Sequence, residues 1–141
     1  MIRLLARAAA AAPDQVAVVT PEGSPTYAEL LRDARALAAF FADPSPVRGD
    51  PSPVRAGMDR FAIVEPDAAW VIRLLAGAAL AGVEACQYQP DTPVGELLPQ
   101  LESFDHTVVL TRRDDLLALS PGHASAVFID PSPVLTDPSP V

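Results

Sequence analysis

Four charged residues stand where predicted strands give way to helices, and their types could do chemistry there. Glu65 and Asp67 follow the strand predicted for 60–64. Arg112 and Arg113 follow the strand predicted for 106–111. Two neighbouring carboxylates can share acid–base work, and two arginines can bind an anion. Asp67 also stands where a helix N-cap is expected, and the arginines stand at a helix start, so we expect a cap and solvated arginines.

Nucleophiles and metal ligands are scattered along the chain. Cys86 is the only cysteine and lies in an apolar strand pattern, which predicts a buried, inert thiol and no internal disulfide. His106 and His123 lack ligand spacing, which argues against a metal site. No GxSxG elbow surrounds any serine: Ser24, Ser45, Ser52, Ser103, Ser120, Ser125, Ser132 and Ser139. We therefore predict no catalytic residue, no cofactor-binding residue and no metal ligand.

A nucleotide-binding site would be recognised by a sequence motif in the loops that follow the strands. Dinucleotide sites carry GxGxxG there, and a P-loop needs a lysine. The loop after residue 64 reads EPDAAW, and the loops after 88 and 111 read QPDTP and RRDD. All ten basic residues are arginines, and the chain contains no lysine. An independent nucleotide-binding domain of Rossmann type is therefore disfavoured.

Composition indicates one folded domain. The 141 residues are 50% hydrophobic and 20% charged, which excludes a disordered chain. The net charge of −8 argues against a nucleic-acid partner. The longest apolar run, AAWVIRLLAGAALAGV, contains Arg73 and is shorter than the roughly 20 residues of a membrane span. The start, MIRLLARAAAAAP, is interpreted as an amphipathic helix and not as a cleaved signal. We expect a cytoplasmic protein without a transmembrane segment.

Helical and strand patterns alternate along the chain. Strands are predicted at 16–20, 60–64, 83–88, 106–111 and 124–129, with helices between them. Thr26 and Glu29 have capping-box spacing, and Gly82 is a predicted helix stop. Pro99 should kink its helix or mark a later helix start. The alternation predicts an α/β fold: a partial doubly wound, mostly parallel sheet with helices on both faces. The alternative for the first strand is antiparallel pairing at an edge of the sheet.

The motif DPSPV occurs four times, at 43–47, 50–54, 130–134 and 137–141. Its two prolines fix φ and remove two donors, so we expect Pro-rich loops and neither helix nor central strand. The predicted domain is an incomplete α/β unit over 1–129, with a repeat insertion at 43–54 and a repeat tail at 130–141. The repeats are interpreted either as Pro-rich docking ligands or as a tolerated sequence duplication.

The order of several segments is more specific than any one motif. These segments are PDQVAVV, TYAELL, GMDRFAIVEPDAAWV and LAGAALAGVEACQYQPDTPVGEL. Together they resemble the beginning of the adenylate-forming acyl ligases, the AMP-binding superfamily that includes fatty acyl-CoA synthetases. The resemblance covers about 2–119 apart from 43–54, and there the first repeat pair replaces a short Gly-containing link of the family.

The resemblance implies a carboxylate activated by ATP to an acyl-adenylate and then passed to a thiol, commonly coenzyme A. In that family the phosphate loop, the adenine and ribose contacts and a catalytic lysine lie later in longer chains, so no catalytic residue is carried over. ATP, Mg and CoA are implied for the full-length enzyme, and no cofactor is expected on this segment. We expect a fragment that is inactive alone, whose partner is the missing C-terminal remainder and whose exposed apolar faces allow self-association. The alternative is a small α/β interaction module that presents the DPSPV arms.

Overall fold

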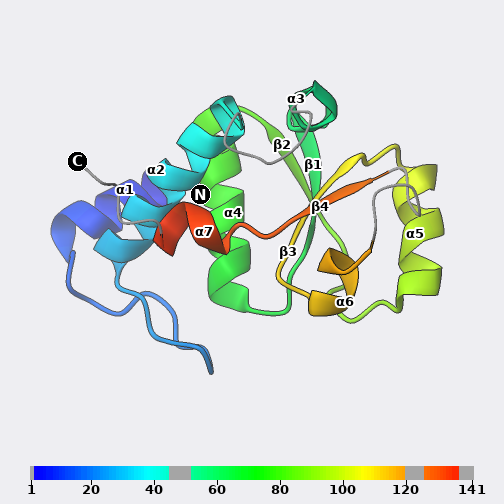
Figure 1. Cartoon of the computed structure of the whole chain (residues 1–141). Coiled ribbons are helices and arrows are strands. Elements are labelled where there is room, and N and C mark those ends of the chain that lie inside the picture. Colours follow the sequence, from blue (N-terminus) through cyan, green and yellow to red (C-terminus); the bar gives the residue numbers. More distant parts are fainter. Residues whose placement is uncertain (1, 45–51, 120–125, 137–141) are drawn as a thin grey trace.

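A four-stranded parallel sheet organises the computed structural model, which describes residues 2–44, 52–119 and 126–136 (Figure 1). Its strands are β1 (Arg60–Val64), β2 (Glu84–Gln87), β3 (Val108–Thr111) and β4 (Val127–Ile129), in the order β2-β1-β3-β4. Helix α4 (Ala68–Ala81) connects β1 to β2, and α5 (Val94–Ser103) connects β2 to β3. Helix α6 (Asp114–Leu117) follows β3. The predicted α/β fold with a parallel sheet is confirmed.

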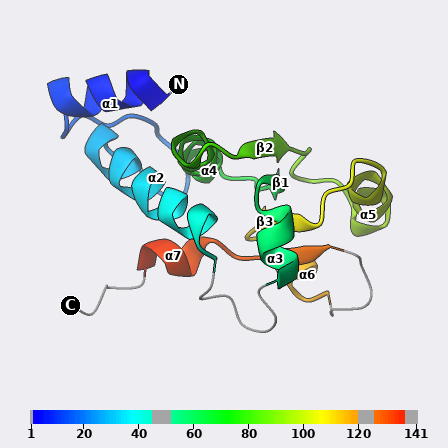
Figure 2. The same cartoon turned by 90° about the horizontal axis from the view of Figure 1, so that it is seen from above.

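The central strand β1 is buried on both faces of the sheet. Phe61 and Ile63 belong to the core cluster that α2 (Tyr27–Ala42) and α4 cover. Ala62 and Val64 belong to a second cluster under α5 and α6. Figure 2 shows the helices on either side of the sheet. Continuous burial of this kind is typical of a strand in a doubly wound sheet.

The two long helices begin and end where the sequence predicts. Thr26 Oγ1 accepts from the N–H of Glu29 at 3.2 Å, and the Thr26 N–H donates to the Glu29 carboxylate at 3.2 Å. Asp67 Oδ2 accepts from the N–H of Trp70 at 3.1 Å and caps α4. Gly82 ends α4 with φ 73°, a left-handed conformation that favours glycine. Within the described ranges, no helix has the length and apolarity needed to cross a bilayer.

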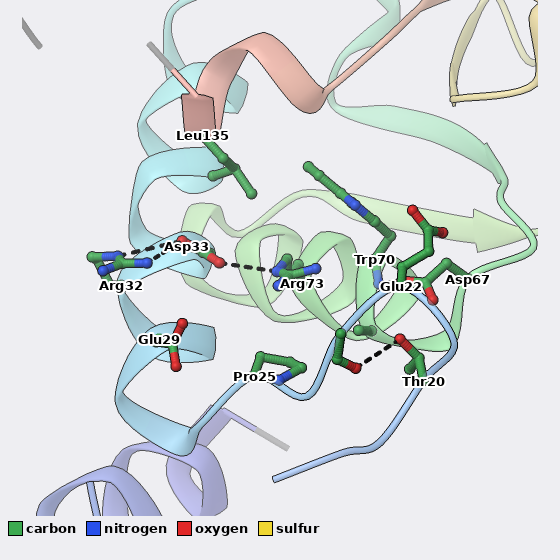
Figure 3. A pocket seen from close by; sticks show the side chains of 12 residues that line it. Thr20, Glu22, Pro25, Glu29, Arg32, Asp33, Asp67, Trp70, Arg73 and Leu135 are labelled. Carbon is green, nitrogen blue, oxygen red and sulfur yellow. Dashed lines mark hydrogen bonds and ion pairs between the residues drawn. The ribbon is translucent and has the colours of Figure 1, made fainter. Parts of the chain in front are cut away.

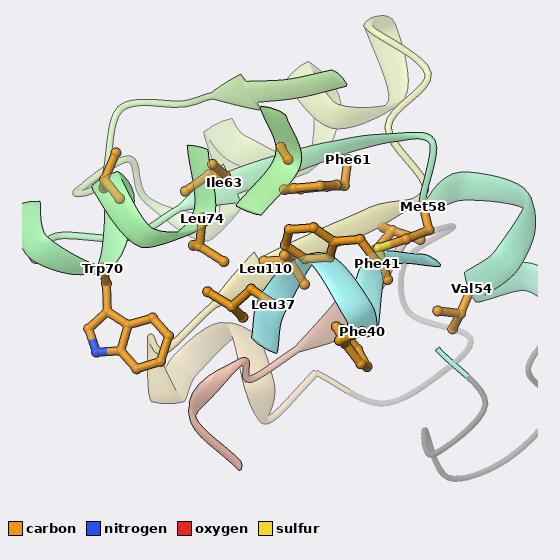
Figure 4. Close-up of a cluster of buried hydrophobic side chains, with 13 residues drawn as sticks. Leu37, Phe40, Phe41, Val54, Met58, Phe61, Ile63, Trp70, Leu74 and Leu110 are labelled. Atoms are coloured by element: carbon orange, nitrogen blue, oxygen red, sulfur yellow. The ribbon is translucent and has the colours of Figure 1, made fainter. Parts of the chain in front are cut away.

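Helices α2 and α4 pack closely on one face of the sheet. A Cβ built on Gly77 would lie 3.0 Å from Leu37 Cβ and 3.1 Å from the Phe41 ring, so an alanine there would require these neighbours to shift by a few tenths of an ångström. Outside α2 lies α1 (Ile2–Ala11), which contributes the buried Leu5. The principal cluster (Figure 4) consists of Leu37, Phe40, Phe41, Val54, Met58, Phe61, Ile63, Trp70, Val71, Leu74, Ala78, Val108 and Leu110.

The strand predicted for 16–20 is wrong. Among the described residues, this segment makes just two isolated antiparallel bridges, Val16 with Thr26 and Thr20 with Gly23. Both partners are close in sequence, so the segment folds back on its own turn and joins no edge of the sheet. Within this run Val19 is 77% exposed, whereas Ala17 and Val18 pack partly buried against the cluster that contains Leu5 and Leu30.

Helix α5 runs through Pro99 from its start at Val94. The later helix start, one of the two outcomes predicted for this proline, is therefore wrong. Proline has no N–H to donate to the carbonyl of Gly95, so this turn of the helix lacks one hydrogen bond.

Two copies of the repeat form helix starts, which corrects the prediction of a loop. Helix α3 (Ser52–Gly57) begins in the second copy and α7 (Ser132–Thr136) in the third. Proline is tolerated in a first turn because the N–H groups there need no helical partner. Asp130 Oδ1 accepts from the Ser132 N–H at 2.8 Å, in the manner of a cap. Val54 is 2% exposed and Val134 packs on the same cluster, so both copies contribute to the core. Residues 45–47 of the first copy, and the whole fourth copy, lie outside the described residues.

Candidate functional site

The carboxyl ends of β1 and β3 define the place where this sheet offers a ligand crevice. The chain leaves β1 for β2 on one side, and β3 lies on the other side of β1. Open α/β sheets bind ligands at such a switch point. Glu65 and Asp67 come from the loop after β1, and Arg112 and Arg113 come from the loop after β3. The structure therefore brings all four predicted charged residues to one edge of the sheet.

The side chain of Arg112 fills this switch point. Its Nε and Nη2 donate to the Glu65 carboxylate at 3.1 and 3.0 Å. Its Nη1 and Nη2 donate to the Glu22 carboxylate at 2.9 and 2.6 Å. The guanidinium carbon lies 5.0 Å from the centroid of the Trp70 ring. Because two carboxylates and an aromatic face surround it, the guanidinium cannot take an anionic ligand without losing one of them.

Hydrogen bonds shift the pKa values of Glu22 and Arg112. The hydrogen bond from Arg112 lowers the pKa of Glu22. The hydrogen bond to Glu22, followed by that to Glu65, raises the pKa of Arg112 above its usual range. The side chain of Glu65 is 0% exposed and that of Glu22 is 54% exposed, so water competes only for the outer carboxylate. Glu22 and Arg112 therefore remain charged near neutral pH and hold each other in place.

Glu65 and Asp67 serve the backbone and do not form an acid–base pair. Glu65 Oε2 accepts from the Asp67 N–H at 2.8 Å, and Asp67 accepts from the N–H of Trp70. The predicted N-cap at Asp67 is confirmed. Glu65 fixes the loop that presents this cap and neutralises Arg112 at the same time.

Arg112 and Arg113 are not solvated, which corrects the sequence prediction. The side chain of Arg113 is 15% exposed, and that of Arg112 is 20% exposed. Arg113 donates to Asp115 at 3.0 and 2.6 Å and to the carbonyls of Pro90 and Thr92 at 3.1 and 2.7 Å. The hydrogen bond with Asp115 raises the pKa of Arg113 and lowers that of Asp115. The arginines thus tie loops together: Asp115 is two residues from Arg113, whereas their other partners lie 21 to 90 residues away along the chain.

His106 and Cys86 lie away from this edge. His106 is 4% exposed, and its Nδ1 lies 2.6 Å from the hydroxyl of Tyr88. Burial lowers the pKa of His106 and raises that of Tyr88. The Nε2 atom of His106 has no partner among the described residues. Cys86 is half-buried on the edge strand β2, whereas a fully buried thiol was expected.

The remaining predicted positions hold no metal cluster in the part of the chain that the structure describes. There, no group of three or more His, Cys, Asp and Glu side chains could hold a metal ion. His123 and four serines lie outside the described residues, the serines being Ser45, Ser120, Ser125 and Ser139.

An open pocket of about 290 Å³ adjoins the Arg112 network (Figure 3). It lies between the hairpin that contains Glu22, helix α2 and helix α4. Arg73 lies within it, with Nε 2.9 Å from Asp33 Oδ2 and its guanidinium carbon 5.1 Å from the Trp70 ring centroid. Sequence reasoning treated Arg73 only as an interruption of an apolar helix. A charged arginine in a buried, apolar helix needs an ion-pair partner. The position of Arg73 in such a helix could therefore have indicated this pocket.

Comparisons with known proteins give structural matches alone. No family model matches the sequence, and no curated protein matches it. A nonribosomal peptide synthetase, FmoA3, bound to α-methyl-L-serine-AMP, is 25% identical with a TM-score of 0.69. The match covers 92% of this chain and 14% of that one.

Two further solved structures share the fold. O-succinylbenzoate coenzyme A synthetase (MenE) from Bacillus subtilis, in complex with AMP, is 22% identical with a TM-score of 0.66, over 93% of this chain and 32% of that one. The NpsA N-terminal subdomain from Klebsiella oxytoca, in complex with 3-hydroxyanthranilyl-AMSN, is 13% identical with a TM-score of 0.70, over 100% of this chain and 32% of that one. The chain thus spans a third or less of the length of these structures. In fold, it resembles the N-terminal part of the adenylate-forming enzymes, the AMP-binding superfamily.

Proposed function

We propose that this chain is the N-terminal segment of an adenylate-forming acyl ligase and acts as its scaffold. The ligase would activate a carboxylate with ATP and Mg and pass the acyl group to a thiol such as coenzyme A. The match supports this proposal because it covers nearly all of this chain but only 14–32% of the neighbours. ATP, Mg, CoA and the acyl group would then contact residues in the remainder of the enzyme.

The main support for the proposal is that the side chain of Arg112 occupies the switch point of the sheet. Where a sheet of this topology offers a ligand crevice, Arg112 contacts Glu65, Glu22 and Trp70. No loop after a described strand has the glycines that allow backbone N–H groups to approach a phosphate. The sequence also has no lysine with which to complete the chemistry of the family. A segment of this kind would position other parts of an enzyme and perform no adenylation by itself.

The neighbours support the class of reaction. MenE is a coenzyme A synthetase solved with ATP and magnesium ion and with an acyl-adenylate intermediate. FmoA3 is bound to an aminoacyl-AMP. An acyl-adenylate is common to both, whereas the coenzyme A step is specific to the first. We therefore propose acyl-adenylate formation for the complete enzyme, with transfer to coenzyme A as the second step.

An interaction module with projecting Pro-rich arms has less support. The second and third repeats begin helices, and Val54 and Val134 pack on the core. Such residues are not free to bind a partner as an extended ligand. Proline-rich docking sequences work in the exposed polyproline conformation.

The coding sequence that follows codon 141 tests the proposal. The expected result is a continuing reading frame that encodes a Ser/Thr/Gly-rich phosphate loop and, near its end, a lysine. The longer product should bind ATP in calorimetry, and the 141-residue chain should give no binding heat. A frame that continues without either motif, or saturable ATP binding by the 141-residue chain, would contradict the proposal.

A further inference from the structure

Residues 19–24 form the tip of the hairpin between α1 and α2, and few contacts hold this tip. The N–H of Thr20 donates to the carbonyl of Gly23 at 2.9 Å, and the N–H of Gly23 donates to the carbonyl of Thr20 at 3.1 Å. Val19 is 77% exposed, and a Cβ built on Gly23 would meet nothing within 4 Å. The backbone of the tip is therefore bonded to itself, and packing at these positions contributes little to its placement.

The residues on either side of the tip are anchored to the body of the chain. Ala17 and Val18 pack on the cluster that contains Leu5 and Leu30. Pro25 is buried, and its carbonyl accepts from the N–H of Ala17 at 2.9 Å. Movement of the tip about these anchors would leave the helices and the sheet intact.

One ion pair connects the tip to the carboxyl edge of the sheet. Glu22 accepts from Nη1 and Nη2 of Arg112 at 2.9 and 2.6 Å. In the part of the chain that the structure describes, no other residue of the tip makes a hydrogen bond or ion pair outside the hairpin. The Glu22 side chain is 54% exposed, so salt screens this pair, whereas Glu65 binds Arg112 with a fully buried carboxylate. An exposed pair of this kind shifts an equilibrium by no more than about fivefold.

The tip also forms one wall of the pocket beside Trp70. Thr20 and Glu22 line this pocket together with Trp70, and Figure 3 shows both of them beside the indole. Trp70 is 8% exposed. Among the described residues, Nη1 of Arg112 donates to Glu22 alone. Withdrawal of the tip would therefore expose both the indole ring of Trp70 and Nη1 of Arg112.

We propose that residues 19–24 are a lid over the switch point, held closed by the Glu22–Arg112 ion pair and opened when that pair is broken. Opening leaves Nη1 of Arg112 accessible to an anionic group of another molecule, while Glu65 keeps the guanidinium in place. Arg73 also attracts Glu22, so low ionic strength favours the closed lid. The inference does not depend on the proposed function.

Quenching of Trp70 fluorescence by acrylamide measures the position of the lid. Trp70 is the only tryptophan of the chain, and acrylamide is uncharged, so salt does not change its access directly. Raising the NaCl concentration from about 0.01 M to about 1 M shortens the Debye length from roughly 30 Å to roughly 3 Å. We expect the quenching constant of the intact chain to rise by about two- to fivefold over this range.

Two variants of Glu22 and a matched control locate the effect. Glu22→Gln should show the raised constant already at low salt, with no further rise when salt is added. Glu22→Asp keeps the charge on a shorter side chain and should be intermediate; it decides the matter if circular dichroism shows that Glu22→Gln does not fold. Asp115→Asn breaks a pair of the same length and exposure, 2.6 Å and 53%, at the same edge but outside the lid. It should be quenched like the intact chain at each salt concentration.

Three results would overturn the proposal. The first is a quenching constant of the intact chain that does not change with salt. The second is an equal constant at low salt for the intact chain and the folded Glu22 variants. The third is a constant for Asp115→Asn that rises as much as that of Glu22→Gln, which would show a general loosening of this edge and no lid.

Discussion

The two faces of the sheet are covered to different depths. One face is covered by α2 and α4, which both contact the sheet, with α1 outside them, whereas α5 and α6 cover the other face in the part of the chain that the structure describes (Figure 2). Side chains between α4 and the sheet are held from two directions, because α2 presses on α4 at Gly77. Side chains under α5 and α6 lie beneath a single layer of helix in the described residues. The deeper face should therefore relax less after a mutation, and stability should be concentrated there.

Truncating one leucine on each face is the strongest test of this difference. Leu74 and Leu97 are both 0% exposed, and they lie in different clusters. We expect Leu74→Ala to lower the free energy of unfolding by about 4–5 kcal/mol and Leu97→Ala by about 2–3 kcal/mol, because α5 can move into the space. Denaturant unfolding of both variants measures the difference between the two losses in free energy of unfolding. Equal losses would show that the two faces are equally rigid.

Removing either of the two carboxylates that bind Arg112 tests how much each contributes to stability at the carboxyl ends of the strands. Glu65→Ala leaves a mostly buried guanidinium with one exposed partner and should cost about 3 kcal/mol. Glu22→Ala removes the outer carboxylate and should cost at most about 1 kcal/mol, since water replaces it. Thermal unfolding of the two variants gives the comparison. A larger loss for Glu22→Ala would mean that the hairpin, and not the buried carboxylate, holds Arg112.

Substituting alanine for one glycine on each face should give a smaller difference in stability between the two faces. Gly77→Ala brings a methyl group to 3.0 Å from Leu37 Cβ and should destabilise the chain by about 1–2 kcal/mol. Gly95→Ala is the matched control, because a Cβ there meets nothing within 4 Å. It should be neutral or stabilise α5 by up to about 1 kcal/mol. Destabilisation by Gly95→Ala would show that another part of the chain packs against α5 at this position.

The smallest expected effect is a pH dependence that arises under α5. Burial lowers the pKa of His106 below its unfolded value of 6.5. The unfolded chain then binds more protons, so stability should be constant above about pH 6.5 and fall as the pH decreases below it. His106→Gln should remove this part of the slope between about pH 5 and 6.5, above the range in which most carboxylates titrate. Parallel slopes for the two proteins would assign the pH dependence to other groups.

Local signals predicted much of this structure. The capping box at Thr26, the cap at Asp67 and the glycine stop at Gly82 depend on a few adjacent residues. The continuous burial of β1 follows from an unbroken apolar run. The alternation of strands and helices then leaves few topologies, and the parallel sheet follows from it.

The candidate site could not be predicted in the same way. Arg112 and Glu22 are 90 residues apart, and no spacing rule connects them. The repeat was misjudged for a different reason: proline was excluded from helices as a whole, although a first turn accepts it. At 16–20 the β-branched run indicated a strand, but its partners are residues of its own turn.

The central claim is that this chain is a scaffold whose adenylation chemistry belongs to the rest of a larger enzyme. Carboxylate-dependent exchange of labelled pyrophosphate into ATP tests it most directly, using the purified 141-residue chain and a panel of fatty, aromatic and amino acids. We predict no exchange above the protein-free control for any acid, and exchange with at least one acid once the remaining polypeptide is supplied. Exchange catalysed by the 141-residue chain alone would contradict the account.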